Sequence, residues 1–301
     1  IVMDVLERAN ELQKQGIDII HLEVGEPDFD VPACVAEAAK AAYDRHLTHY
    51  THSLGDPELR REIAAFYLRE YGVTVDPDCI VVTSGSSPSI LLALMLLCNP
   101  DSEVILSNPG YACYRNFVLA TQAKPVLVPL FKEYLQYDIE AIRKCVNPHT
   151  AAIFINSPMN PTGRTISAEL LEQIFKRCEK LGIFVVLDEC FCEFLENPET
   201  ARANIDRMKK FPNLFLLRAF TKIHAMPGLR LGYGFCSDKK LLDKMEQMRQ
   251  PWSVSTAAQE AGAAALKETD RVEKTRRYVA GERRWICLLY TSPSPRDRSL
   301  S

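Results

Sequence analysis

The chain carries two apolar stretches that decide its fold, IFVVLDE at residues 183–189 and LFLLRAFTK at residues 214–222. Each is an almost continuous run of apolar residues that leads to a charged one, Asp188 in the first and Lys222 in the second. Strands without polar alternation are typical of a parallel sheet that helices cover on both faces. The two stretches therefore predict buried strands that present a carboxylate and an amine at their ends.

The same alternation of apolar runs and helical patterns extends over most of the chain. Predicted strands cover residues 80–83, 103–107, 125–128, 151–155, 183–188, 214–217 and 232–236, and predicted helices cover residues 86–98, 111–121, 167–181 and 239–249. Ser167 and Gly182 suit the start and the end of one of these helices. We expect an α/β fold with a mostly parallel seven-stranded sheet sandwiched by helices, whose ligands bind beyond the carboxyl ends of the strands.

Composition narrows the classes of function. The chain has 301 residues, of which 47% are apolar and 25% charged, and its net charge is −3. This balance is ordinary for a globular protein and offers no basic field for nucleic acid, and the longest apolar stretch, residues 90–98, is too short to span a bilayer. Ten scattered cysteines without a C-x-x-C pair indicate free thiols rather than a zinc site. We expect a cytoplasmic protein that binds no nucleic acid, membrane or metal.

Both ends of the chain are atypical. It begins with Ile1 instead of Met and enters an amphipathic helix that Gly16 closes. Residues 287–301 change composition abruptly and resemble translated sequencing-adapter sequence. We expect a fragment, truncated at the C-terminus, whose foreign or disordered tail breaks the helical pattern of residues 255–286.

Groups that could bind a ligand follow several predicted strands. TSGSS at residues 83–87 opens a helix, where N–H groups suit a phosphate, although a plain N-cap has the same sequence. Asn160 lies in an N-P-T-G segment that is typical of a turn. Asp188, Lys222 and Arg230 supply a carboxylate, an amine and a guanidinium, and each alone could be a cap or a surface residue. In this order at strand ends, they are the groups that a pyridoxal phosphate enzyme needs.

From about Val5 to about Trp285 the sequence resembles the fold-type I pyridoxal phosphate enzymes, specifically the class I/II aminotransferases. The motifs that carry the resemblance are Gly25-Glu26-Pro27-Asp28-Phe29, Tyr50-Thr51 with Gly55 and Leu59-Arg60, Asn160-Pro161-Thr162-Gly163, Asp188-Glu189, Thr221-Lys222 and Gly228-Leu229-Arg230-Leu231-Gly232-Tyr233. The resemblance implies pyridoxal 5′-phosphate as cofactor, and an amino acid and a 2-oxo acid as small-molecule substrates.

The resemblance implies a role for each residue of the reacting centre. Lys222 corresponds to the lysine that forms the Schiff base and shuttles the proton. Asp188 corresponds to the acid that keeps the pyridine nitrogen protonated. Asn160 would bond the 3′ oxygen of the cofactor, and Tyr111 would stack on its ring.

The resemblance also implies a phosphate site shared between subunits. Ser86, Ser87, Thr221 and Arg230 correspond to residues that hold the phosphate. Tyr50 matches the tyrosine that reaches the phosphate of the neighbouring subunit's cofactor. We therefore expect a homodimer with shared active sites.

The substrate side of the resemblance is less complete. Gly25 matches the backbone position that lies against the substrate carboxylate, but the arginine that binds this carboxylate in the family would lie beyond the end of this chain. Phe191 replaces a tyrosine that donates to the 3′ oxygen, so the Schiff base is expected to titrate at higher pH. Ala219 stands where a Ser or Thr often contacts the phosphate.

The resemblance implies a division of the chain into domains. Residues 1–35 would belong to a small domain, residues 36–255 would form the cofactor-binding large domain, residues 256–286 would link to an incomplete second small domain, and residues 287–301 would be the tail. The predicted activity is the transfer of an amino group from an α-amino acid to a 2-oxo acid.

Three alternatives to that activity remain open at this point. Residues 188–191 and 218–222 also resemble threonine-phosphate decarboxylases and histidinol-phosphate aminotransferases, and a lyase of the same fold breaks another bond at Cα. A non-catalytic module, such as the sensing half of a transcription regulator, is a further reading, although no helix-turn-helix precedes Val5.

Overall fold

The computed structural model describes residues 2–197 and 199–291. The chain divides into two compact units, Ile1–Asp30 and Val31–Ser301. The first unit contains helix α1 (Val2–Lys14), and Gly16 follows it with a φ of 83°, as its sequence predicts. The second unit contains the sheet and the other described helices, and its predicted division at residues 255 and 286 stays a prediction.

The second unit is built on one seven-stranded sheet. Its strands are β1 (Ile80–Thr83), β2 (Glu103–Asn108), β3 (Lys124–Pro129), β4 (Thr150–Asn156), β5 (Phe184–Asp188), β6 (Leu214–Ala219) and β7 (Gly232–Phe235). Their order across the sheet is β1-β7-β6-β5-β4-β2-β3. Only β7 pairs antiparallel, with β1 and with β6, whereas the other pairs are parallel. The prediction of a mostly parallel seven-stranded sheet is confirmed.

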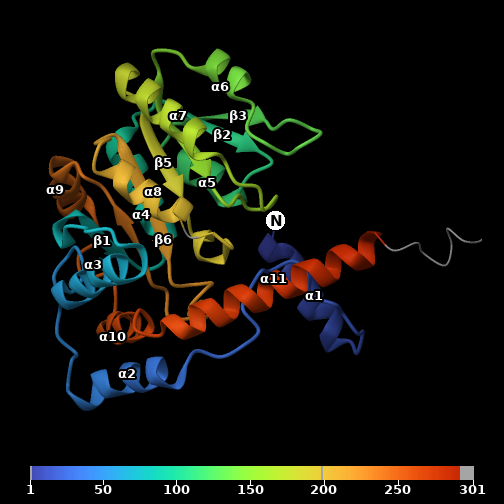
Figure 1. Ribbon diagram of the computed structural model, residues 1–301, viewed down its shortest axis with the longest axis vertical. Helices are drawn as coiled ribbons and strands as arrows, with labels where there is room; N and C mark the ends of the chain where they lie inside the picture. Colours follow the sequence, from blue (N-terminus) through green and yellow to red (C-terminus); the bar gives the residue numbers. More distant parts are fainter. Residues whose placement is uncertain (1, 198, 292–301) are drawn as a thin grey trace, which may run out of the picture. The chain divides into compact units, whose positions relative to one another are not determined.

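Helices cover both faces of the sheet (Figure 1). One core cluster combines alternate residues of the central strands, such as Val185 and Leu216, with α3 (Pro57–Tyr71), α7 (Ala168–Leu181) and α8 (Glu199–Met208). The other combines the intervening residues, such as Val186 and Phe215, with α4 (Ser86–Leu97), α5 (Ala112–Ala120) and α9 (Lys239–Met248). Because side chains alternate along a strand, neighbouring residues of β5 and β6 enter different cores.

Local chemistry explains where the helices begin and end. The Ser167 side chain accepts a hydrogen bond from the Leu170 N–H, which caps α7, and Gly182 ends the helix in the left-handed conformation. The structure also contains α2 (Ala33–Asp44), α6 (Ile139–Cys145) and α10 (Thr256–Ala265). Their ranges were not among those that the sequence predicted as individual helices, apart from the pattern over residues 255–286.

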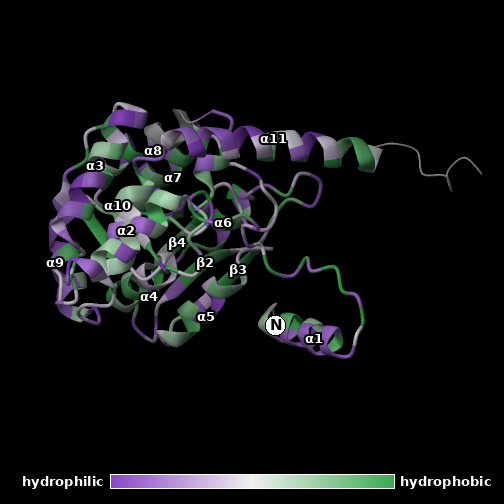
Figure 2. Ribbon diagram, turned by 90° about the horizontal axis from the view of Figure 1, so that it is seen from below, coloured by the Kyte–Doolittle hydropathy of each residue, from purple (hydrophilic) through white to green (hydrophobic). Residues whose placement is uncertain are grey.

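The helical pattern of residues 255–286 corresponds to two helices, α10 and α11 (Thr269–Thr291). The helix continues through residues 287–291, where we expected the pattern to break, and residues 292–301 of the predicted tail lie outside the described residues. The last turns of α11 expose Leu288, Leu289 and Tyr290 (Figure 2). Within the described chain, no helix has the length and apolar character that crossing a membrane requires.

Candidate functional site

All seven strands of the sheet meet at one edge. Strands β1 to β6 run in the same direction, so their carboxyl ends lie together, and antiparallel β7 begins at that edge. Asp188 pairs with Asn156 of β4 and with Leu217 of β6, and Gly232 pairs with Thr83. The segments that the sequence singled out after these strands therefore follow one continuous edge.

Asp188 is a buried carboxylate at the end of β5, 6% exposed. Its Oδ2 accepts a hydrogen bond of 2.6 Å from the Tyr114 hydroxyl, and its Oδ1 accepts one of 3.0 Å from the Cys190 N–H. Burial and the neighbouring Asp188 charge raise the pKa of Tyr114 well above its ordinary value, so the phenol keeps its proton and acts as a donor. Both oxygens of the carboxylate thus have a defined donor.

Tyr111 lies at the N-terminus of α5, next to this carboxylate. Its ring meets that of Tyr114 edge to face, with centroids 5.2 Å apart. Burial raises the pKa of Tyr111, the Cys113 thiol and the Asp188 charge add to the rise, and a hydrogen bond with Ser87 opposes it. The phenol of Tyr111 therefore bonds the start of α4 and is within reach of the field of Asp188.

The start of α4 is a cradle for an anion. Gly85 caps the helix with a φ of 87°, and a Cβ placed on it would lie 2.5 Å from Nη2 of Arg230. A Cβ on Gly232 would lie 2.5 Å from the Ser86 nitrogen. The backbone of β7 and the guanidinium of Arg230 thus pack directly on the first turn of α4, where N–H groups and the helix dipole favour a phosphate.

Arg230 is held in this place by the loop that precedes β7. Its Nη1 donates to the Pro227 carbonyl at 2.9 Å, and its own φ is 55°. A left-handed conformation in a residue other than glycine costs free energy, and such strain is frequent at functional sites. The predicted role of Arg230 at the phosphate stays a prediction.

Lys222 and Thr221 are half-buried in the turn that follows β6. The Lys222 carbonyl accepts a hydrogen bond of 3.1 Å from the Ala225 N–H, which closes the turn. Two residues further on, burial lowers the pKa of His224 to about 4, so this ring is neutral at physiological pH. The turn places Lys222 at the edge of the sheet at which Asp188 also lies.

Asn160 is tied to the acid through a residue that the sequence did not single out. The Asn160 N–H donates to Oδ1 of Asn156 at 2.6 Å, and Nδ2 of Asn156 donates to the Asp188 carbonyl at 3.0 Å. Asn156 is buried at the end of β4, four residues before Asn160. A polar residue that closes an apolar strand was the available signal.

Two predicted residues are not joined to this group. Tyr50 is 78% exposed and stacks on Trp252, with ring centroids 4.2 Å apart and planes inclined by 16°. Gly25 lies in the first unit, Ile1–Asp30. The roles of Tyr50 and Gly25 stay predictions.

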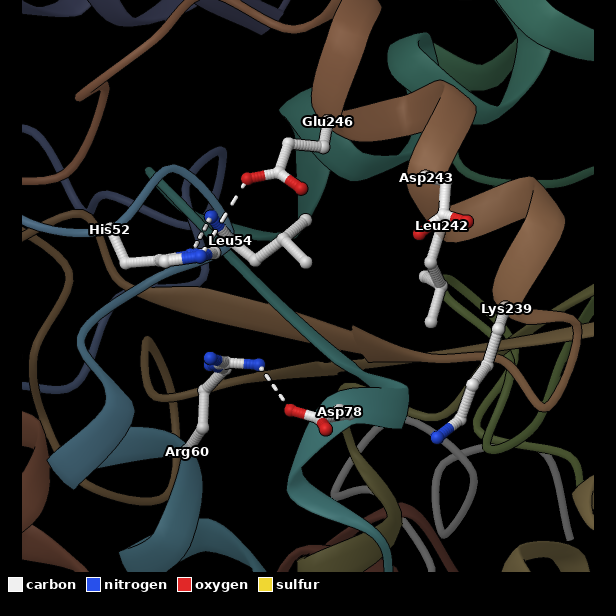
Figure 3. Close-up of a pocket in the computed structure, with 8 residues that line it drawn as sticks. All are labelled: His52, Leu54, Arg60, Asp78, Lys239, Leu242, Asp243 and Glu246. Atoms are coloured by element: carbon white, nitrogen blue, oxygen red, sulfur yellow. Dashed lines mark hydrogen bonds and ion pairs between the residues drawn. The ribbon is translucent and has the colours of Figure 1, made fainter.

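A pocket of about 250 Å³ lies elsewhere, between α3, α9 and the start of β1 (Figure 3). Two pairs of its lining side chains contact each other: Arg60 with Asp78 at 3.2 Å and His52 with Glu246 at 3.8 Å. None of the residues that the sequence singled out for the cofactor lines this pocket. The chemistry of the sheet edge, not this pocket, defines the candidate site.

The comparisons with known proteins agree with the geometry of the sheet edge. The sequence profile described as aminotransferase class I and II matches residues 17–288. Among curated relatives, a (5-formylfuran-3-yl)methyl phosphate transaminase from Methanocaldococcus jannaschii is 33% identical over 273 residues, which cover 90% of this chain and 70% of that protein. An aspartate aminotransferase from Pyrococcus horikoshii is 33% identical, over 89% of this chain and 68% of that protein.

Solved structures give the same answer. The aspartate aminotransferase from Thermus thermophilus with maleate superposes with a TM-score of 0.85 at 30% identity, covering 96% of this chain and 76% of that chain. An alanine aminotransferase from Pyrococcus furiosus superposes with a TM-score of 0.84 at 28% identity, covering 95% and 75%. The relatives named here are all transaminases, which does not favour the decarboxylase, lyase or regulator alternatives.

Proposed function

Since this chain belongs to the class I and II aminotransferases, we propose that the sheet edge around Asp188, Lys222 and Arg230 is its active site. The chain is a pyridoxal-phosphate-dependent transaminase that exchanges an amino group between an amino acid and a 2-oxo acid. The observation that supports the placement is the packing of Arg230 on Gly85 at the same edge at which Asp188 is buried.

The residues present fit the cofactor. A phosphate requires N–H donors and a cation, which the first turn of α4 and Arg230 provide. Ser86 and Ser87 in that turn, and Thr221 next to Lys222, would add hydroxyl groups. A protonated pyridine nitrogen requires an acid beside it, and the buried Asp188 side chain is held in place by two donors. The donor set therefore matches both ends of pyridoxal 5′-phosphate.

Pyridoxal phosphate, when bound, supplies a ring that accepts the electron pair released at Cα of the amino acid. Lys222 would anchor the cofactor covalently, and its Nζ would take the proton from Cα and return it during the exchange. Asp188 would hold the proton on the ring nitrogen. Asn160 would bond the 3′ oxygen, and Tyr111 would cover one face of the ring.

We also propose the assembly and the compartment. Tyr50 is an exposed aromatic on an exposed partner, Trp252, which suits a side chain that reaches the phosphate site of a second copy. Gly25 would lie against the substrate carboxylate. All ten cysteines are free thiols, which supports a reducing compartment such as the cytoplasm.

The test is absorbance of the purified chain with pyridoxal 5′-phosphate, before and after borohydride, followed by peptide mapping. We expect a visible band, fixation of the cofactor on Lys222, and loss of the band when a suitable amino acid such as aspartate, alanine or an aromatic amino acid is added. The Lys222→Ala variant should lose the band, whereas the exposed-lysine control Lys144→Ala should keep it. Fixation at another lysine would contradict the proposed site.

A further inference from the structure

Tyr114 has no role in the function as stated so far, yet its hydroxyl makes the shortest hydrogen bond to the acid. The distance from its oxygen to Oδ2 of Asp188 is 2.6 Å, and the phenol is 4% exposed. The second oxygen, Oδ1, is held by the Cys190 N–H at 3.0 Å. One donor on each oxygen fixes the plane of the carboxylate.

The position of the phenol is itself fixed by packing. Tyr111 and Tyr114 are three residues apart, so both rings lie on one face of α5. The Tyr114 ring contacts Tyr111 edge to face and lies 5.1 Å from the ring of Phe154 on β4. A side chain confined in this way delivers its hydroxyl to one place, as a positioning group must.

The other ionisable groups around the carboxylate have different partners or positions. Tyr137 uses its hydroxyl on the backbone of Asn156, accepting from the N–H at 2.7 Å and donating to the carbonyl at 3.2 Å. Tyr111 interacts with Ser87, and the Cys190 thiol interacts with Ser86 and also with Asp188. Tyr114 is therefore the phenol that bonds the carboxylate directly.

We propose that Tyr114 is a positioning residue, which holds the Asp188 carboxylate oriented toward the ring nitrogen of the cofactor. The inference rests on the proposed function, because it assigns the ring nitrogen to Asp188. A donor to a carboxylate stabilises the charged form, and the remaining lone pairs of the two oxygens stay available to accept from the ring. Tyr114 acts only through Asp188 and does not touch the reacting atoms.

The experiment compares two ligands on protein stripped of cofactor. One is pyridoxal 5′-phosphate, and the other is its analogue in which carbon replaces the ring nitrogen. Both have the same aldehyde and phosphate, so the ratio of their dissociation constants isolates the contact with the ring nitrogen. We expect the preference for the nitrogen ligand to fall about tenfold in Tyr114→Phe, since one hydrogen bond to a charged group is lost.

Two controls separate positioning from loss of structure. Tyr67→Phe removes another buried phenol, which bonds Tyr233 at 3.1 Å in the opposite core, and should leave the ratio unchanged. Asp188→Asn should remove most of the preference. If Tyr114→Phe folds poorly, 3-fluorotyrosine at position 114 keeps the packing and strengthens the donor, and the preference should rise.

The outcomes distinguish the inference from the function beneath it. Wild-type protein that binds neither ligand would contradict the proposed active site. Wild-type protein that prefers the nitrogen ligand, together with a Tyr114→Phe variant of unchanged ratio or a fluorotyrosine variant of lower ratio, would overturn the role of Tyr114 alone. A Tyr114→Phe variant that weakens both ligands equally would likewise show a purely structural residue and refute the proposal.

Discussion

Two acids follow one another at the end of β5 and enter opposite sides of the sheet. Asp188 faces α5 and is held by uncharged donors, the Tyr114 hydroxyl and the Cys190 N–H. Glu189 bonds Nη2 of Arg218 at 2.5 Å, and Nη1 of the same arginine bonds Glu193 at 2.8 Å. The donors on Asp188 orient its carboxylate, whereas Arg218 neutralises the carboxylate of Glu189.

The surroundings of Glu189 suit a role in stability. Arg218 and Glu189 are each 1% exposed, and the guanidinium lies 5.7 Å from the centre of the Tyr67 ring. Burial raises the pKa of Glu189, and Arg218 opposes that rise. Fully buried ion pairs are costly to break. A carboxylate that is held only by uncharged donors can still attract a cationic group of a ligand. Because side chains alternate along β5, Glu189 stabilises the fold on one face of the sheet, and Asp188 is available for chemistry on the other face.

The largest effect should follow from removing Arg218, the cation that pairs with the buried Glu189 and Glu193. Arg218→Met leaves Glu189 and Glu193 buried without their guanidinium, and we expect a loss of about 3–5 kcal/mol in the free energy of unfolding. Denaturant unfolding of the cofactor-free protein measures it. The triple variant Arg218→Met, Glu189→Gln, Glu193→Gln should recover much of the loss, because no buried charge is left alone. A single variant as stable as the wild type would show that the cluster does not support the fold.

The next largest effect concerns Asp188, the acid on the opposite face of the sheet. Asp188→Asn removes the charge that would hold the ring proton, and we expect kcat/KM for transamination to fall about 10²–10³-fold. The matched variant Glu189→Gln, one residue away, should reduce stability more than Asp188→Asn does and activity much less. Equal activity losses in the two variants would mean that the two faces are not separated as the comparison states.

A third effect tests the turn after β6 through pH. The pKa of His224 falls from 6.5 to about 4 on folding, because burial and Arg271 lower it more than Glu193 raises it. The unfolded chain therefore binds more protons between these values, so the stability from the neutral ring is complete above about pH 6.5 and is lost as pH falls toward 4. For a fully buried group the loss approaches about 3 kcal/mol.

The measurement is the free energy of unfolding at several pH values between 4 and 7. His224→Gln cannot titrate, so its stability should depend less steeply on pH in this window than that of the wild type. Parallel curves for the two proteins would show that His224 is not the group that titrates.

The sheet and most of its edge could be predicted from the sequence because their signals are local. Each strand is an apolar run, and the residues that close these runs, such as Asp188, identify the edge at which ligands bind. The order of the strands, β1-β7-β6-β5-β4-β2-β3, was not predicted, because the runs themselves do not specify which strands are neighbours. The seven predicted strands all appear, with ends that differ by one or two residues.

The partners of these residues could not be predicted, because they depend on which helix covers which face. Alternation along β5 separates Asp188 from Glu189, but it does not say that α5 brings Tyr114 to the first and that β6 brings Arg218 to the second. Asn156 was missed for a related reason, since its side chain joins the end of β5 to the loop at Asn160. Long-range pairing of side chains leaves little trace in local sequence.

The smallest effect is expected when one hydroxyl oxygen is removed on each face of the sheet, by Tyr67→Phe on one face and by Tyr114→Phe on the other. Tyr67→Phe keeps the ring beside Arg218 and removes only the hydrogen bond with Tyr233, so we expect a loss of about 1 kcal/mol in unfolding free energy. Cofactor affinity should not change, whereas Tyr114→Phe should alter the preference for the ring nitrogen. Calorimetric unfolding and the ligand ratio, measured on both variants, test this. A Tyr67→Phe protein with a changed ratio would show that the stability side also acts on the site, since Arg218 and Lys222 are joined by only three residues of chain.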